Sequence, residues 1–157
     1  MKILTPEIKE FVKRVKLGFI ATVCPDGTPN LSPKGTLTAW DDQHLVFADI
    51  HSPGTIKNLL VNPAIEINVV DVFIRKGYRF KGTAKVLSEG TLFNVILSFY
   101  NDSTRSNYVI KNVVMVKVDQ VLPVYSPAYD SETEEQIVKR WTEYWSSVYG
   151  SSDSSRH

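Results

Sequence analysis

The apolar positions of this chain follow two periods, one typical of strands and one typical of helices. After Thr5-Pro6, a pair that favours a helix start, apolar residues recur every three or four positions and basic residues fill the other face. This pattern predicts an amphipathic helix whose apolar face comprises Ile8, Phe11, Val12 and Val15. Residues 18–23 are apolar and rich in β-branched side chains, Pro25-Asp26-Gly27 favours a turn, and residues 28–39 can return antiparallel. The sequence therefore predicts a hairpin after the first helix.

The rest of the chain alternates between strand and helix patterns. The further predicted strands span residues 45–48, 64–70, 77–87 and 109–124, and the predicted helices between them span 53–61 and 89–100. Several strands interrupted by short helices favour a small barrel over a doubly wound parallel sheet. We predict a mainly β (α+β) fold, a six-stranded antiparallel split β-barrel with short peripheral helices and a C-terminal helix. The basic row Arg79, Lys81 and Lys85 is interpreted as the solvated face of a strand, with a substrate entrance as the alternative.

The C-terminal segment carries its own helix signals. Ser131-Glu132-Thr133-Glu134 has the spacing of a capping box, and one apolar face follows it, made of Ile137, Trp141, Tyr144, Trp145 and Val148. Residues 151–157 are polar and of low complexity, which is typical of a disordered tail. The predicted organisation is thus a single domain over residues 1–150, followed by a tail over residues 151–157.

Composition narrows the classes of function. The chain has 157 residues, 43% of them hydrophobic, and a net charge of +1, which favours one packed domain and disfavours nucleic acid or an anionic membrane as partner. A single cysteine, Cys24, excludes an internal disulfide, and its spacing from the three histidines predicts no metal site. Signal-peptide and membrane-span patterns are absent from the sequence, so we expect a cytoplasmic protein. It also lacks the nucleophile-elbow, zinc-protease and phosphate-loop motifs.

The segment from Phe47 to Pro63 predicts a buried strand, a polar corner and a short helix whose start is open to an anion. Ser52 is a favoured N-cap, Pro53 suits the first helical position, and Gly54 lets a ligand approach the backbone. Free amides and the partial positive charge of a helix start bind phosphate groups. An ordinary capped helix that binds nothing fits the same residues.

A second polar segment, Leu31 to Thr36, lies on a predicted neighbouring strand. Pro33 cannot donate to a central ladder, so it marks an edge, a bulge or a place where another molecule completes the pairing. Lys34 is the candidate cation for a bound phosphate, and a solvated surface lysine is the alternative.

The ordered combination of these segments, with Trp40-Asp41-Asp42 between them and Asn62-Pro63 after the helix, resembles the pyridoxamine 5'-phosphate oxidase-like family of FMN-binding split β-barrels. The resemblance covers about residues 5 to 125. It implies FMN as cofactor and a homodimer with the flavin at the subunit interface, where the C-terminal aromatic face could cover the partner's flavin. The cofactor-binding residues that it implies are Ser32, Pro33, Lys34, Gly35, Thr36, Asp49, Ser52, Thr55, Asn58 and Leu59.

The chain also departs from the true oxidases of that family. Gly54-Thr55 stands where those enzymes carry an Arg-Lys pair for the flavin phosphate, and the C-terminal Arg-x-His element has no counterpart. This argues against pyridoxamine 5'-phosphate as the substrate. We predict an FMN-dependent oxidoreductase that passes hydride or electrons between small molecules through flavin N5, and the sequence identifies no catalytic residue. The alternatives are a non-catalytic electron carrier or sensor, and a deazaflavin- or haem-binding relative.

Overall fold

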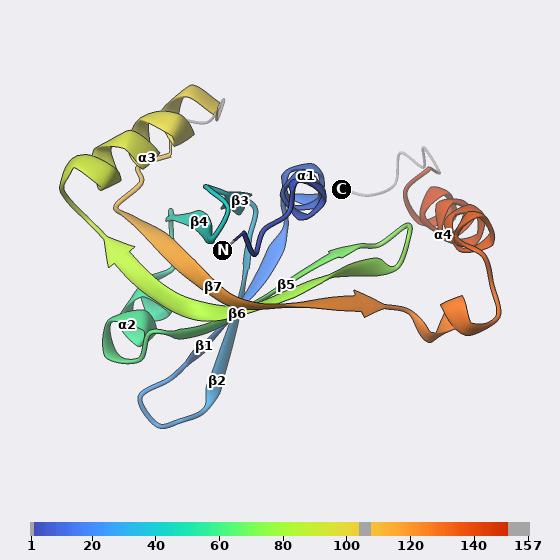
Figure 1. Ribbon diagram of the computed structural model, residues 1–157, viewed down its shortest axis with the longest axis horizontal. Coiled ribbons are helices and arrows are strands. Elements are labelled where there is room, and N and C mark those ends of the chain that lie inside the picture. Colours follow the sequence, from blue (N-terminus) through green and yellow to red (C-terminus); the bar gives the residue numbers. More distant parts are fainter. Residues whose placement is uncertain (1, 104–107, 151–157) are drawn as a thin grey trace, which may run out of the picture.

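The computed structural model describes residues 2–103 and 108–150 (Figure 1). Its strands form one antiparallel sheet in the order β2-β1-β5-β6-β7-β4-β3. They are β1 (Gly18–Val23), β2 (Pro29–Lys34), β3 (Thr38–Ala39), β4 (His44–Asp49), β5 (Ala64–Asp71), β6 (Lys76–Leu87) and β7 (Asn112–Tyr125). The helices are α1 (Pro6–Val15), α2 (Pro53–Val61), α3 (Thr91–Ser103), the short 3-10 helix η1 (Pro127–Asp130) and α4 (Glu134–Tyr149). The polar tail predicted for residues 151–157 lies outside the described residues.

The sheet curls into the predicted antiparallel split barrel, so the fold class is confirmed, but it contains seven strands, not six. The predicted strand over residues 28–39 is two strands. Its first part pairs with β1 as far as Gly18 opposite Lys34, and the chain then turns and pairs with β4, with Thr38 opposite Val46. β2 is an edge strand of the sheet, which accommodates Pro33.

The barrel interior is filled by side chains that alternate along the strands. β5 buries every second residue, and Phe47 and Phe80 from neighbouring parts of the sheet are at most 1% exposed. The sheet is tight at Gly77, where an added Cβ would lie 2.0 Å from the Val69 carbonyl oxygen. The amphipathic helix α1 closes this interior with Ile8 and Val12. The interior is therefore a packed core.

A second apolar cluster lies on the outer face of the sheet. β4 buries both faces, since Leu45 and Phe47 point into the barrel while Val46 and Ala48 join the outer cluster. α3 covers this outer face with the residues Phe93, Ile96 and Tyr100. The uninterrupted apolar run of β4 follows from this double burial.

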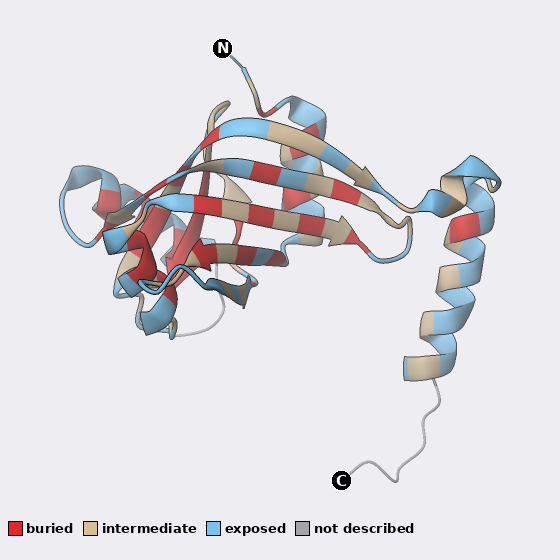
Figure 2. Cartoon of the chain, turned by 90° about the horizontal axis from the view of Figure 1, so that it is seen from below, coloured by how far each residue is buried: buried red, intermediate tan, exposed pale blue. Residues whose placement is uncertain are grey.

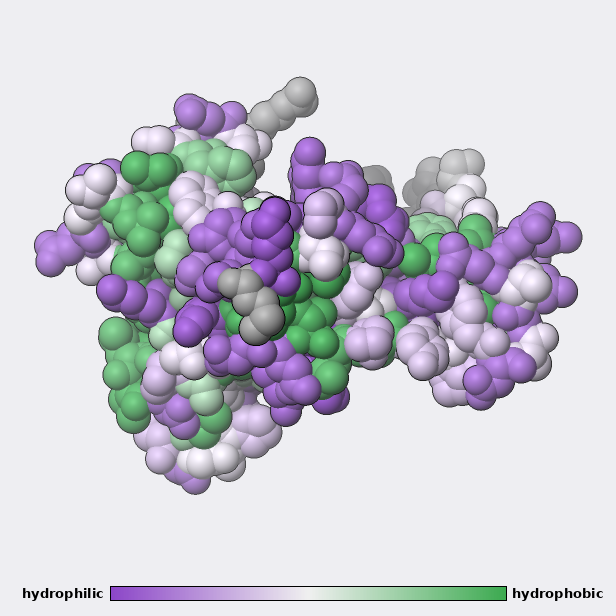
Figure 3. Space-filling view, in the orientation of Figure 1, coloured by the Kyte–Doolittle hydropathy of each residue, from purple (hydrophilic) through white to green (hydrophobic). Residues whose placement is uncertain are grey.

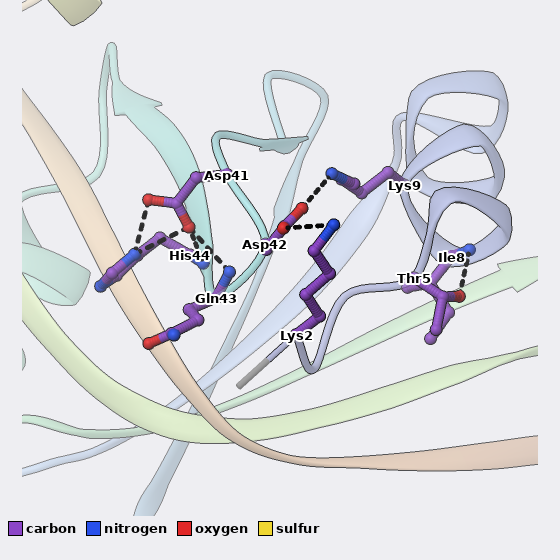
Figure 4. Close-up of polar contacts among 8 residues, drawn as sticks. All are labelled: Lys2, Thr5, Ile8, Lys9, Asp41, Asp42, Gln43 and His44. Carbon is purple, nitrogen blue, oxygen red and sulfur yellow. Dashed lines mark hydrogen bonds and ion pairs between the residues drawn. The ribbon is translucent and has the colours of Figure 1, made fainter.

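The amino-terminal segment is tied to the turn before β4 (Figure 4). The Asp42 carboxylate accepts from Lys9 Nζ at 2.5 Å and lies 3.4 Å from Lys2 Nζ. Asp41 closes the same turn through the amide and ring of His44. These contacts fix α1 beside β3 and β4.

α4 extends away from the sheet beyond the end of β7 (Figure 2). Its first turn is anchored by buried Ile137 and by an ion pair of 2.6 Å between Lys76 Nζ and Glu134 Oε2. The capping box lies two residues later than predicted, because Ser131 is the C-cap of η1 and the box is formed by Thr133 and Gln136. Among the described residues, no helix has the length and apolarity needed to cross a membrane.

Candidate functional site

A buried lysine lies where the end of β2 meets the start of α2. Lys34 is 7% exposed. Its Nζ donates to Ser52 Oγ at 2.5 Å and to Ser32 Oγ at 2.6 Å, and the Pro33 carbonyl oxygen lies 3.5 Å away. In the part of the chain that the structure describes, no carboxylate forms an ion pair with this ammonium. We call Ser32, Lys34, Ser52 and the first turn of α2 the lysine corner.

The first turn of α2 adds backbone donors to the lysine corner. Ser52 occupies the N-cap position, as predicted, but its side chain makes no capping hydrogen bond, and its Oγ accepts from Lys34. Pro53 has no N–H, so Gly54 and Thr55 provide the first free amides of the helix. A helix start and a buried ammonium therefore direct positive charge to the same corner.

Asp49 supports this corner from the end of β4. Its carboxylate accepts from the Ser52 amide at 2.9 Å and from Asn112 Nδ2 at 3.0 Å. Burial lowers the pKa of the Lys34 ammonium below its ordinary value, and the negative charge of Asp49 opposes this shift only in part. A bound anion would favour the charged form of Lys34. The chemistry of the corner fits a phosphate group.

The structure brings most of the predicted cofactor-binding residues to this side of the barrel: Ser32, Pro33, Lys34, Gly35, Thr36, Asp49 and Ser52. The three others are turned into the protein. Thr55 is 2% exposed, Leu59 belongs to the barrel core, and Asn58 donates through Nδ2 to Thr22 Oγ1 at 3.1 Å. Contact between these three side chains and a ligand stays a prediction.

A pocket of about 580 Å³ begins at Gly35 and Thr36 and continues between α1 and α3. Its aromatic wall consists of Trp40, Phe99 and Tyr100. The pocket is completed by Lys13, Lys16, Leu37, Thr38, Ala39 and Ser103, and we call it the aromatic pocket. Tyr100 Oη donates to the Thr36 carbonyl oxygen at 2.8 Å, and burial raises the pKa of this phenol. The wall is thereby fixed to the segment that follows the lysine corner.

Sequence reasoning missed Asn112 and the aromatic pocket. Asn112 reaches Asp49 because the two residues are opposite each other in the β4–β7 ladder. The predicted helix over residues 89–100 includes Phe99 and Tyr100. The sequence does not indicate that these two side chains face Trp40 and Thr36. Within residues 2–103 and 108–150, no three His, Cys, Asp or Glu side chains gather as a metal site requires.

Comparisons with known proteins identify the family and the fold. Residues 4–122 match the family model described as Pyridoxamine 5'-phosphate oxidase, and no curated protein matches the chain. Among solved structures, Group A Streptococcus HupZ is 30% identical with a TM-score of 0.71, over 79% of this chain and 96% of that one. An FMN-binding protein from Syntrophomonas wolfei subsp. wolfei is 20% identical with a TM-score of 0.67, over 78% of this chain and 87% of that one.

An F420 reductase is also 20% identical, with a TM-score of 0.58 over 75% of this chain and 98% of that one. The likeness to this reductase and to the Syntrophomonas protein concerns the fold alone. The family model, in contrast, spans β1 to β6, most of β7 and the lysine corner. The chain belongs to the pyridoxamine 5'-phosphate oxidase family.

Proposed function

We propose that this chain is an FMN-dependent oxidoreductase in which the lysine corner holds the cofactor phosphate. The observation that carries the proposal is Lys34, a buried ammonium whose hydrogen-bond acceptors are two hydroxyls and a carbonyl. A phosphate dianion would supply the missing countercharge and would accept from Lys34 and from the amides of Gly54 and Thr55. When bound, FMN supplies hydride or electron transfer through its N5 atom.

The residues after Lys34 would orient the flavin ring. β2 ends at Lys34 and β3 begins at Thr38, so the backbone of residues 35–37 lies outside both ladders. Apart from the Thr36 carbonyl oxygen, which accepts from Tyr100 Oη, its backbone groups can pair with the polar edge of an isoalloxazine ring. Because Gly54-Thr55 replaces the Arg-Lys pair of the true oxidases, amides, hydroxyls and Lys34 would carry the affinity for the phosphate.

We further propose a homodimer with the flavin at the subunit interface. Leu31 on β2 and Leu60 and Val61 on α2 are 67%, 71% and 68% exposed, and these two elements form the lysine corner. Apolar surface over α2 and α3 is visible in Figure 3. Light scattering should give twice the 17.7 kDa chain mass, and a strict monomer with FMN bound would contradict a shared site. A cytoplasmic location stays a prediction.

A visible spectrum of the purified protein tests the main proposal. We expect flavin absorption bands and FMN released on denaturation; a colourless preparation that binds neither added FMN nor F420 would overturn the flavin assignment. Binding of F420 in preference to FMN would replace FMN by a deazaflavin. Anaerobic addition of a nicotinamide donor separates an enzyme from an electron carrier, because an enzyme turns over with an added acceptor while a carrier is reduced only stoichiometrically.

A further inference from the structure

The aromatic pocket is built on elements outside the barrel interior. α1 precedes the first strand and α3 lies between β6 and β7, and the pocket lies between these helices and residues 35–40. Figure 1 shows α1 and α3 on opposite sides of β3 and β4. Its volume of about 580 Å³ lies in the range of small-molecule sites.

The aromatic wall is held in place before any ligand enters. The rings of Trp40 and Phe99 meet edge to face with centroids 5.8 Å apart, and those of Phe99 and Tyr100 meet at 5.3 Å. The hydrogen bond from Tyr100 Oη to the Thr36 carbonyl oxygen fixes the third ring. Such rings offer planar apolar surface at low cost in conformational entropy.

Two lysines give the same pocket a positive charge. Lys13 on α1 and Lys16, the C-cap of α1, line it, and no aspartate or glutamate among the described residues does. Among the described residues, neither lysine forms an ion pair, whereas Lys9 on the same helix is bound to Asp42 at 2.5 Å. The tie between Lys9 and Asp42 holds α1 against the turn that leads into β4 (Figure 4). Lys13 and Lys16 follow on the same side of the molecule and line the aromatic pocket. Aromatic rings together with two available cations favour an aromatic ligand that carries a negative charge.

We propose that the aromatic pocket binds the reaction partner of the flavin, and that this partner is a planar, conjugated molecule carrying a carboxylate or an equivalent anionic group. The pocket shares Gly35 and Thr36 with the segment along which the flavin ring would lie. A planar ligand in the pocket would therefore lie next to the flavin ring. The assignment as reaction partner depends on the proposed FMN site, while the chemistry of the pocket depends on its own residues.

Titration with 2-naphthoate and the uncharged 2-naphthamide tests the proposal on the FMN-loaded protein. We expect naphthoate to bind about tenfold more tightly than the amide, since a charge-assisted hydrogen bond is worth about 1.4 kcal/mol or more. The double variant Lys13→Gln/Lys16→Gln should lose this preference, while Lys139→Gln on α4 should keep it. Phe99→Ala should weaken both ligands, and Leu92→Ala, an equally exposed apolar residue on α3 outside the pocket, should weaken neither.

The possible results of this titration distinguish a failure of the pocket proposal from a failure of the proposed FMN site. Equal binding of naphthoate and naphthamide would overturn the proposal, and so would displacement of FMN by naphthoate. The proposed function would stand in both cases, provided that the spectrum recorded before naphthoate is added shows bound flavin. Naphthoate that binds selectively and perturbs the flavin absorption without releasing FMN would support it. Selective binding to a protein that refuses FMN would support the pocket chemistry and overturn its role as the site of a flavin reaction partner.

Discussion

Two buried charges of this protein have opposite surroundings. Asp71 at the end of β5 is 8% exposed and Lys34 at the end of β2 is 7% exposed. The Asp71 carboxylate pairs with Arg14 and accepts from the amides of Phe73 at 2.9 Å and Ile74 at 3.2 Å. Lys34, in contrast, donates only to uncharged oxygens. The chain pairs one buried charge with an arginine, whereas the other has no ion-pair partner among the described residues.

The pKa directions express the same difference. Burial by itself would raise the pKa of Asp71, but the hydrogen bonds from Arg14 and the two amides outweigh it and bring this pKa below its ordinary value. For Lys34 burial prevails over the charge of Asp49, so its pKa is lowered. A buried charge with its partners inside the chain has a structural role, and one without them is a candidate binding group.

The largest expected effect is the loss of FMN affinity when the ammonium group of Lys34 is removed. Lys34→Met should weaken FMN binding about 100-fold, roughly 3 kcal/mol, because a charge-assisted hydrogen bond to the phosphate is lost. Riboflavin, which has no phosphate, should lose less than about threefold. Fluorescence titration of both flavins measures the two losses. Lys81→Met is the matched control, since this lysine is exposed and lies 3.5 Å from a Glu66 carboxylate oxygen. Equal losses for FMN and riboflavin would place the phosphate elsewhere.

Replacing Asp71, whose charge is paired inside the protein, should lower the stability of the fold and leave the affinity for FMN unchanged. Asp71→Asn should lower the free energy of unfolding by about 2 kcal/mol, because Arg14 and two amides lose a charged acceptor. Half-exposed Arg14 recovers part of its solvation, which keeps the loss at this size. Urea denaturation measures it, with Glu66→Gln in the exposed pair with Arg79 as a control expected within about 0.5 kcal/mol of the parent protein. A loss of FMN affinity in folded Asp71→Asn protein would contradict the separation of the two sites.

The lowered pKa of Lys34 also predicts how the affinity for FMN depends on pH. Affinity should fall as pH drops below about 6, where a phosphate monoester takes up its second proton. It should also fall as pH rises through the lowered pKa of free Lys34, below the ordinary value of 10.5, because the ligand then meets an uncharged amine. Lys34→Gln should keep the acid decline and lose the alkaline one. Titrations at several pH values check this, and an unchanged alkaline decline would assign it to another group.

The smallest expected effect is a change in the unfolding free energy of the FMN-free protein when Lys34 is replaced. Because the pKa of Lys34 is lower in the folded than in the unfolded chain, its charge destabilises the fold below the folded-state pKa, and this penalty fades as pH rises toward 10.5. Lys34→Met should therefore raise the unfolding free energy of the FMN-free protein at pH 7 by about 1 kcal/mol. The gain should shrink at alkaline pH. Thermal unfolding of FMN-free samples tests it, and a destabilised variant would show that Lys34 is structural.

The sequence predicted those parts of the fold that depend on local patterns. The amphipathic face of α1, the alternation of β5 and the Ser52-Pro53 helix start are all confirmed, because each is set by neighbours within one turn or strand. The separate β3 was missed because its boundary depends on a turn at residues 35–36 and on pairing with β4.

Two other features could not be predicted because distant residues decide them. Ser131 and Thr133 both begin a capping-box pattern, and the choice of Thr133 follows from η1 and from the ion pair that Glu134 makes with Lys76. Within the candidate site, Lys34 was predicted as the cation, but its burial and its contact with Ser52, 18 positions away, arise only in the folded chain.

The missing side-chain cap at the start of α2 has a consequence for the protein in the cell. If the phosphate of the coenzyme completes the first turn of this helix, loading becomes part of maturation, because a ligand that binds only the folded chain lowers the population of unfolded molecules. Chains made when the coenzyme is scarce would be cleared faster by proteases than chains that capture it. Vitamin supply would then set the abundance of this protein as well as its activity.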